Sequence, residues 1–272
     1  MLSHALIAAA MMASSHAGTS FNLSGQPTPQ EAWTILAEGN ADWVAGKVEL
    51  ANATPKRVAE TAENGQNPFV TILSCSDSRV PVEVVFNRGV GDIFSVRVAG
   101  NVADTDEIGS VEYGVGHLHT PLLVVLGHTS CGAVTAVAKG AEVHGSIPQL
   151  IDNIQPVVER ERVRFLGQID DAEFVQRCIE ANVFQSVEDL IARSSEVREL
   201  VQSGKLKIVG AVYDLKTGKV SQLGSHPFES DLIARYQGEA GTGHASKVED
   251  AKPAARPSRS RPSAQANDGG GH

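Results

Sequence analysis

The sequence predicts an α/β fold with a mostly parallel sheet of about four to five strands flanked by helices. Short apolar runs rich in β-branched residues are the first observation, because continuous apolar runs suit strands buried on both faces of a parallel sheet. The second observation is that helical patterns separate these runs, which is typical of α/β proteins. The predicted strands are 69–73, 93–98, 122–126 and 206–213, and a short fifth run follows at about 220–223.

Helical patterns account for most of the remaining chain. Thr28 and Glu31 have the spacing of a capping box, with Pro29 at the first helical position, so a helix is expected from there to about residue 45. Residues 61–68 are expected to form a loop, because Asn-Gly and Pro break regular structure. The other predicted helices are about 106–118, 132–139, 147–164, 171–181 and 186–203, and residues 216–219 are expected to form a hairpin turn.

One folded domain is expected, at about 28–235. Residues 18–27 are polar and are predicted to be a linker, whereas 236–272 is rich in Gly, Ala, Ser, Pro and charge and is predicted to be disordered. Residues 1–17 contain a short apolar run and a small-x-small cleavage pattern typical of a signal peptide, although no basic residue precedes the run. A periplasmic or secreted protein is therefore expected, and a cytoplasmic protein with a weakly helical start is the alternative.

Composition excludes several classes of partner. The 272 residues carry a net charge of −9, which argues against nucleic acid as a partner because phosphates need basic side chains. No segment approaches the roughly 18 consecutive apolar residues of a membrane span. Only three cysteines occur, so a disulfide framework is not expected and metal ligation, catalysis or burial must account for them.

Two polar motifs each follow a predicted strand. The first runs from Cys75 to Arg79, and the second contains His128 and Cys131. Sites in open parallel sheets form at the carboxyl ends of the strands, so the two motifs are expected at one edge. Two thiolates and one imidazole suit tetrahedral Zn²⁺, and the sequence therefore predicts zinc ligation by Cys75, His128 and Cys131.

The number of ligands favours catalysis. A structural zinc site is usually closed by four protein ligands, whereas a catalytic site keeps one position for water. The third cysteine, Cys178, lies in a helical pattern far along the chain and is interpreted as a small buried apolar residue. A lone cysteine or histidine is usually structural too, but this alternative weakens when three such residues occur at equivalent strand ends.

Asp77 and Arg79 flank one serine beside the first ligand, so their side chains can pair. Asp77 is close enough to accept a hydrogen bond from a group at the zinc, and Arg79 would keep its carboxylate ionised. The alternative is a surface ion pair, which contributes little. Beside an open metal position, the pair is predicted to be catalytic.

These two motifs, CSDSRVP and GHTSCGA, resemble the signature segments of the β-class carbonic anhydrases, and the resemblance covers roughly residues 30–225. It implies one zinc ion per subunit and the reversible hydration of carbon dioxide to bicarbonate. It also implies a homodimer or a higher even-numbered homo-oligomer, in which dimers form the active-site cleft and N-terminal helices reach over the neighbour.

The resemblance also implies substrate-binding residues. Gln66 matches a glutamine that donates to bicarbonate, Phe94 and Tyr113 match positions lining the pocket, and Gly132 matches a backbone amide that faces the substrate. Two positions depart from the family's pattern, and the second of them, together with Gln66, bears on the subtype. Val98 replaces the usual asparagine, which puts the local hydrogen bonding in doubt, and Ile72 replaces the Trp of the subtype with an effector pocket. The chain thus resembles the open subtype, with water as the fourth zinc ligand.

Two other functions remain open from the sequence. A hydrolase of carbon disulfide or carbonyl sulfide on the same scaffold would use the same ligands, so only a substrate assay separates it. A zinc-binding protein without turnover is the alternative from another class, and Asp77, Arg79 and Gln66 argue against it because a metal can be held without them.

Overall fold

The computed structural model describes residues 25–237. The predicted signal peptide, most of the predicted linker and the predicted disordered tail beyond residue 237 lie outside the described residues. The last three linker residues lead into the domain, where the Gln26 amide donates to Asn67 Oδ1 at 2.8 Å and to the Pro68 carbonyl at 3.1 Å. Among the described helices, none is both long and apolar enough to cross a membrane.

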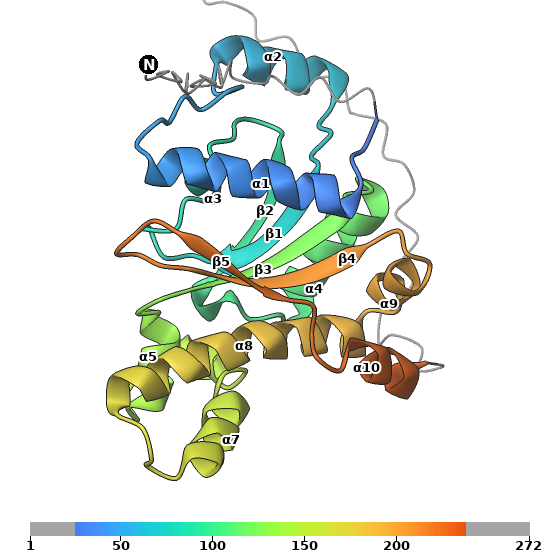
Figure 1. Ribbon diagram of the computed structural model, residues 1–272. Coiled ribbons are helices and arrows are strands. Elements are labelled where there is room, and N and C mark those ends of the chain that lie inside the picture. Colours follow the sequence, from blue (N-terminus) through green and yellow to red (C-terminus); the bar gives the residue numbers. More distant parts are fainter. Residues whose placement is uncertain (1–24, 238–272) are drawn as a thin grey trace, which may run out of the picture. The chain divides into compact units, whose positions relative to one another are not determined.

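A five-stranded sheet forms the centre of the domain, which confirms the predicted fold class (Figure 1). The strand order is β2-β1-β3-β4-β5, and every neighbouring pair is parallel except β4 and β5. The two central strands, β1 and β3, are buried along their whole length, as the continuous apolar runs predict. The strands are β1 Val70–Cys75, β2 Ile93–Val98, β3 Leu122–His128, β4 Lys207–Tyr213 and β5 Val220–Gly224.

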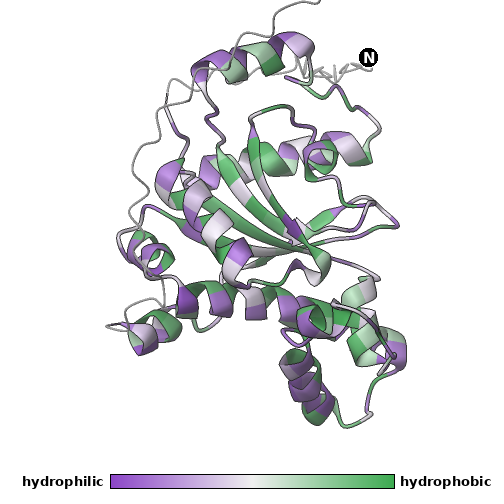
Figure 2. Cartoon of the chain, turned by 180° about the vertical axis from the view of Figure 1, so that it is seen from behind, coloured by the Kyte–Doolittle hydropathy of each residue, from purple (hydrophilic) through white to green (hydrophobic). Residues whose placement is uncertain are grey.

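Helices cover both faces of the sheet and divide the core into two apolar clusters. On one face α1 (Pro29–Val44) and α3 (Val82–Val85) pack against the strands. On the other face α8 (Asp171–Arg193) is the main element. Figure 2 shows the resulting contrast between apolar strands and helices with mixed polar and apolar surfaces. Also on the α8 side are α4 Thr105–Glu112, α5 Gly132–Ala138, α7 Gln155–Phe165 and α9 Ser195–Gln202.

The first helix begins where the capping box predicts. Thr28 Oγ1 accepts from the Glu31 amide at 3.3 Å, and the Glu31 carboxylate accepts from the Thr28 amide at 2.8 Å. The predicted hairpin turn at 216–219 is also present, because the Asp214 carbonyl accepts from the Gly218 amide at 2.8 Å. The remaining elements are α2 Pro55–Asn64, η1 Ala99–Asn101, η2 Tyr113–His117, α6 Ile147–Ile151 and α10 Glu229–Tyr236.

Several predicted boundaries are wrong. Residues 61–64 are not loop but the end of α2, a surface helix that buries no side chain and so contributes no residue to the core. The pattern over 147–164 is two helices, because Pro156 cannot continue a preceding turn and stands in the first turn of α7. The helix expected over 106–118 is shorter as an α-helix, because α4 ends at Glu112. The chain continues from there as the wider π-helical turn η2.

The predicted boundary between the helices expected at 171–181 and 186–203 is also wrong. The chain continues as one helix, α8, to Arg193, and it breaks at Ser194. Two glycines let α8 approach the sheet closely. A Cβ at Gly127 or Gly210 would lie 2.7 or 2.9 Å from a methyl group of Val183, so Val183 of α8 needs both glycines to reach the strands.

Candidate metal centre

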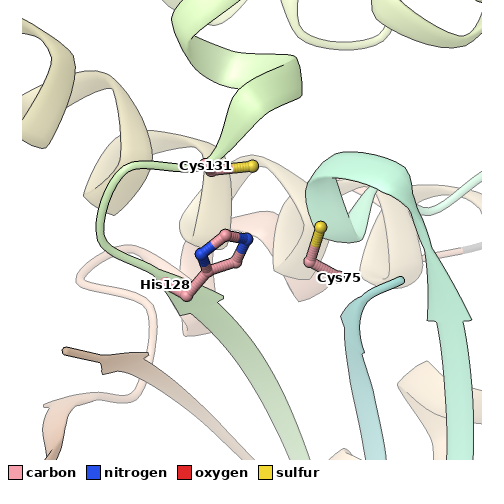
Figure 3. Close-up of side chains that lie close together, drawn as sticks. All are labelled: Cys75, His128 and Cys131. Carbon is pink, nitrogen blue, oxygen red and sulfur yellow. The ribbon is translucent and has the colours of Figure 1, made fainter. Parts of the chain in front are cut away.

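The three predicted metal ligands meet at the carboxyl edge of the sheet. Cys75 is the last residue of β1 and His128 is the last residue of β3, and Cys131 directly precedes α5. From β1 the chain crosses to β2 on one side and then to β3 on the other side, so this edge is the switch point where ligands bind in open α/β sheets. Figure 3 shows the three side chains pointing toward one another.

The donor atoms of these residues form the one cluster of metal-ligand type within residues 25–237. All lie within 4.8 Å of one another, and all three residues are buried. The Nδ1 of His128 lies 3.0 Å from the Thr129 carbonyl, which fixes the ring so that Nδ1 donates. The other nitrogen, Nε2, is buried and has no hydrogen-bond partner among the described residues. A buried imidazole nitrogen left in this way beside two sulfurs fits a zinc site.

A hydrogen bond joins the two sulfurs and affects the pKa of both thiols. A hydrogen bond with Cys131 is the main reason why the pKa of Cys75 falls to about 4, and the Gly100 amide also stabilises the Cys75 thiolate. The same bond between the two thiols, together with burial, raises the pKa of Cys131. One proton is thus shared between the sulfurs, and an ion that binds both thiolates releases it.

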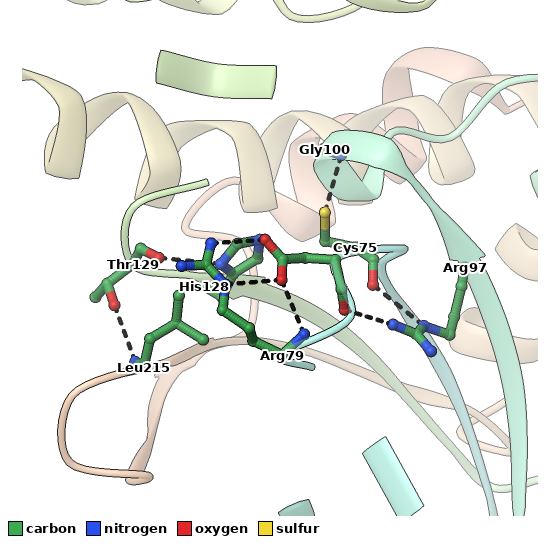
Figure 4. A network of polar contacts seen from close by, with 8 residues as sticks. Cys75, Arg79, Arg97, Gly100, His128, Thr129 and Leu215 are labelled. Atoms are coloured by element: carbon green, nitrogen blue, oxygen red, sulfur yellow. Dashed lines mark hydrogen bonds and ion pairs between the residues drawn. The ribbon is translucent and has the colours of Figure 1, made fainter. Parts of the chain in front are cut away.

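Asp77 and Arg79 form the pair predicted from the sequence (Figure 4). Arg79 Nε donates to Asp77 Oδ1 at 2.9 Å and Nη2 donates to Oδ2 at 2.7 Å. The Arg79 amide adds a third bond to Oδ1 at 2.9 Å. These bonds hold the pKa of Asp77 well below its usual range. Asp77 Oδ2 lies 4.0 Å from His128 Nε2, so the carboxylate faces the metal centre.

Arg97 is a second cation at this segment, and its role is not predicted by the sequence. Its Nη2 donates to the Asp77 carbonyl at 2.7 Å, and its Nε donates to the Cys75 carbonyl at 3.2 Å. Figure 4 shows Arg97 and Arg79 approaching the Cys75–Asp77 segment from different sides. Arg97 directly precedes Val98 in the sequence, and that position alone does not reveal what its side chain binds.

The predicted substrate-binding residues are not all near the ligands. Gly132 directly follows Cys131 and has open space around its α-carbon. Gln66 is exposed in the loop between α2 and β1. The rings of Phe94 and Tyr113 are 5.8 Å apart, but Phe94 is level with Thr71 in the sheet. Thr71 precedes Cys75 by four residues, so within one protomer this aromatic pair is displaced roughly 13 Å along the strand from Cys75.

Val98, the first departure noted in the sequence, takes part in the site through its backbone. Its carbonyl accepts from the Ser76 amide at 3.1 Å, directly beside Cys75. This bond does not need the side-chain amide that the family usually has at this position. Ile72, the second departure, is fully buried in β1.

These observations define a class of protein. It is a three-layer α/β protein with a buried Cys₂His metal centre at the switch point of a mostly parallel sheet. Residues 70–220 match the family model described as carbonic anhydrase. The chain belongs to the carbonic anhydrase family. Carbonic anhydrase 2 of Mycobacterium tuberculosis is 40% identical over 195 residues, which are 70% of this chain and 91% of that protein.

Other relatives place the chain in the β class. A carbonic anhydrase of Mycolicibacterium smegmatis is 36% identical over 202 residues, which cover 73% of this chain and 94% of the relative. The crystal structure of the β-carbonic anhydrase CafA of Aspergillus fumigatus matches with a TM-score of 0.61 at 29% identity, over 75% of this chain and 97% of that chain. The Coccomyxa β-carbonic anhydrase in complex with acetazolamide matches with a TM-score of 0.56 at 26% identity, over 68% and 83% of the two chains.

Proposed function

We propose that this chain catalyses the reversible hydration of carbon dioxide to bicarbonate and a proton. One zinc ion per subunit is held by Cys75, His128 and Cys131. The observation that carries this proposal is the buried, unpartnered Nε2 of His128, which lies beside two cysteine sulfurs and faces the Asp77 carboxylate. The relatives named carbonic anhydrase support the same reaction.

When bound, zinc supplies a Lewis acid that produces hydroxide from water near neutral pH. The chain's own residues then orient the reaction. Asp77 accepts a hydrogen bond from the hydroxyl group that attacks carbon dioxide, which turns a lone pair of that oxygen toward the carbon. Arg79 holds the Asp77 carboxylate ionised and in one position through its two side-chain bonds. The Gly132 amide stabilises the negative charge that develops on the substrate oxygen.

The open subtype is part of this proposal. Both carboxylate oxygens of Asp77 accept from Arg79, so each already has a hydrogen-bond donor in the protein. Because Asp77 faces the metal centre but has both oxygens bound by Arg79, we take water, and not Asp77, as the fourth zinc ligand. Ile72, which stands where the effector-binding subtype has Trp, supports the same subtype.

A dimer completes the substrate pocket in this proposal. Phe94 lies too far along β2 to line the pocket of its own protomer, by the displacement of roughly 13 Å given above, and the Tyr113 ring in η2 packs beside it at 5.8 Å. Tyr113 is 46% exposed, which leaves it accessible to a second copy. We therefore place the aromatic pair of one protomer, together with Gln66, at the metal centre of its partner.

Replacing Asp77 with Asn tests the assignment. The zinc content should stay at one ion per subunit, because Asp77 is not a ligand, whereas kcat for carbon dioxide hydration should fall roughly 10- to 100-fold. Stopped-flow hydration assays with and without a zinc chelator measure this. Asp104→Asn is the matched control. Asp104 also pairs with an arginine, because its Oδ1 lies 2.7 Å from Nη2 of Arg193, but it does not belong to the Cys75–Arg79 segment.

Unchanged turnover in Asp77→Asn would refute the role of the pair. Assays of carbonyl sulfide and carbon disulfide on the same samples separate the alternative reaction. Hydrolysis of either compound at a higher kcat/KM than that for carbon dioxide would overturn the proposed substrate but not the zinc site.

A further inference from the structure

A short turn between β2 and α4 connects the metal centre to the long helix α8. This turn, η1, contains Gly100 and Asn101, and both are buried. The Gly100 amide donates to Cys75 Sγ at 3.3 Å. Hydrogen bonds to a sulfur that carries negative charge are stronger than bonds between neutral groups, so this amide bears directly on how Cys75 holds a metal.

Two side chains of α8 hold the carbonyl groups of the same turn. Asn182 Nδ2 donates to the Gly100 carbonyl at 2.7 Å, and Ser186 Oγ donates to the Asn101 carbonyl at 2.8 Å. Both side chains are only 1% exposed, so water does not compete for these bonds. The two donors lie one helical turn apart on α8 and more than 80 residues from the turn that they hold.

Packing fixes the turn from the other side. Gly100 has a φ of 74°, a conformation that favours glycine. A Cβ at this position would lie 2.7 Å from Ile154 Cδ1 and 3.2 Å from the Ala133 Cβ of α5. The Gly100 amide therefore has little freedom to move: α8 holds the carbonyl groups, and α5 with Ile154 closes the space beside the α-carbon.

We infer that Asn182 and Ser186 are positioning residues for the metal centre. The two side chains hold the turn η1, and through it they position the Gly100 amide against the Cys75 sulfur. This inference rests on the proposed zinc site. Loss of either donor leaves a buried carbonyl without its partner and releases the turn, so the amide moves away from the sulfur. Partners of this kind outside the ligand set change metal affinity by roughly 10- to 100-fold when they are mutated.

The test compares zinc affinity in matched pairs of variants of the full chain. Asn182→Asp is paired with Asn40→Asp, because Asn40 is also a buried asparagine whose amide holds two carbonyls, those of Val85 and Gly218, on the opposite face of the sheet. Ser186→Ala is paired with Ser194→Ala, since both serines are 1% exposed. Competition with a chromophoric chelator gives the zinc dissociation constant, and urea unfolding of the metal-free proteins gives the stability of each.

We expect Asn182→Asp and Ser186→Ala to raise the zinc dissociation constant by roughly tenfold or more. The two controls should lose similar stability and keep zinc affinity within about twofold of the parent. The inference would be overturned if each variant bound zinc as tightly as its matched control. If Asn182→Asp does not fold, the comparison of Ser186→Ala with Ser194→Ala alone tests the inference. Failure of the unmodified chain to bind zinc would instead refute the proposed function.

Discussion

Arg79 and Arg97 both bind the segment Cys75–Asp77, but they bind different parts of it. Arg79 binds the carboxylate of Asp77, and Arg97 binds backbone carbonyls on either side of Ser76. The first arrangement controls the charge and direction of one side chain, and the second controls where the backbone places it. Replacing each arginine should therefore affect the reaction in a separable way.

Arg97→Lys should lower kcat/KM for hydration about tenfold, because misplacing a reacting group by about 1 Å has large effects on rate. An ammonium group lacks the planar fork that reaches two carbonyls at once. Stopped-flow rates measured beside zinc content check this prediction, with Arg57→Lys as the control. Arg57 is half-buried, and its Nε also donates to a carbonyl, that of Val90. Loss of zinc in parallel with activity would show that Arg97 supports the ligand Cys75 rather than Asp77.

Asp189 on α8 offers a prediction about stability and pH. Burial raises its pKa to about 6 from the usual 3.8, although Gln185 donates to its Oδ1 at 2.9 Å. The unfolded chain ionises Asp189 at a lower pH than the folded chain does. This carboxylate therefore costs no stability below about pH 4, and its cost grows until the pH passes about 6.

Asp189→Asn should accordingly be more stable than the parent at pH 8, by up to about 2 kcal/mol, since part of the shift is screened at a partly exposed site. The difference should shrink as the pH falls from 6 to 4. Urea unfolding of both metal-free proteins across this range measures it. A difference that is constant with pH would show that the carboxylate is not the cause.

The junction between α8 and α9 depends on one side chain. Ser194 Oγ accepts from the Val197 amide at 3.1 Å and donates to Glu112 Oε1 at 2.6 Å, so it caps α9 and ties it to α4. Ser194→Ala should lower the free energy of unfolding by about 1 kcal/mol, the usual cost of losing an N-cap. Ser194→Thr, which keeps a hydroxyl, should restore most of it. Urea unfolding of both variants checks this, and an equal loss in the two would contradict the capping role.

The same helix shows why some elements could not be predicted from the sequence. Asn182 and Ser186 are polar residues at the gap between the two helical patterns expected at 171–181 and 186–203. In the structure they point inward and hold carbonyls of η1, so contacts distant in sequence decide that the helix continues. The helix α2 was missed for the opposite reason, because it buries no side chain.

The strands and the metal ligands, by contrast, can be predicted from short segments of the sequence. A strand buried on both faces must be apolar throughout, so the β1 and β3 runs are visible without tertiary information. The motifs at their ends name Cys75, His128 and Cys131 because few residue types bind zinc. A residue that acts through backbone carbonyls, such as Arg97, has no such signature, since many side chains can donate to a carbonyl.

At the scale of the whole molecule, the distribution of site residues predicts how two copies cooperate. Each protomer contains a complete ligand set, whereas its Phe94, with the Tyr113 ring beside it, is displaced roughly 13 Å in the strand direction from Cys75. β2 is an edge strand of the sheet, and edge strands are common sites of association between chains. Sedimentation should show a dimer or a larger even-numbered assembly.

Mixing two impaired variants tests whether the aromatic pair serves the partner. Cys75→Ser should abolish activity, and Tyr113→Ala should lower kcat/KM by roughly tenfold through loss of pocket contacts. In a hybrid dimer, one site combines the intact ligands of the Tyr113→Ala protomer with the intact aromatic pair of the Cys75→Ser protomer. Co-expression in equal amounts makes about half of the dimers hybrids in a two-fold symmetric assembly. Each hybrid has one intact site out of two, so the activity of the mixture should reach about a quarter of the parent's.

The purified hybrid, isolated with two different affinity tags, sharpens this comparison because it removes both parental homodimers. It should show about half of the parent's kcat/KM per dimer, since one of its two equivalent sites is intact. If the aromatic pair served its own protomer, the only site with ligands would lack Tyr113, and the hybrid would be no more active per intact ligand set than Tyr113→Ala alone. That result would place Tyr113 within the pocket of its own chain and would refute the shared site.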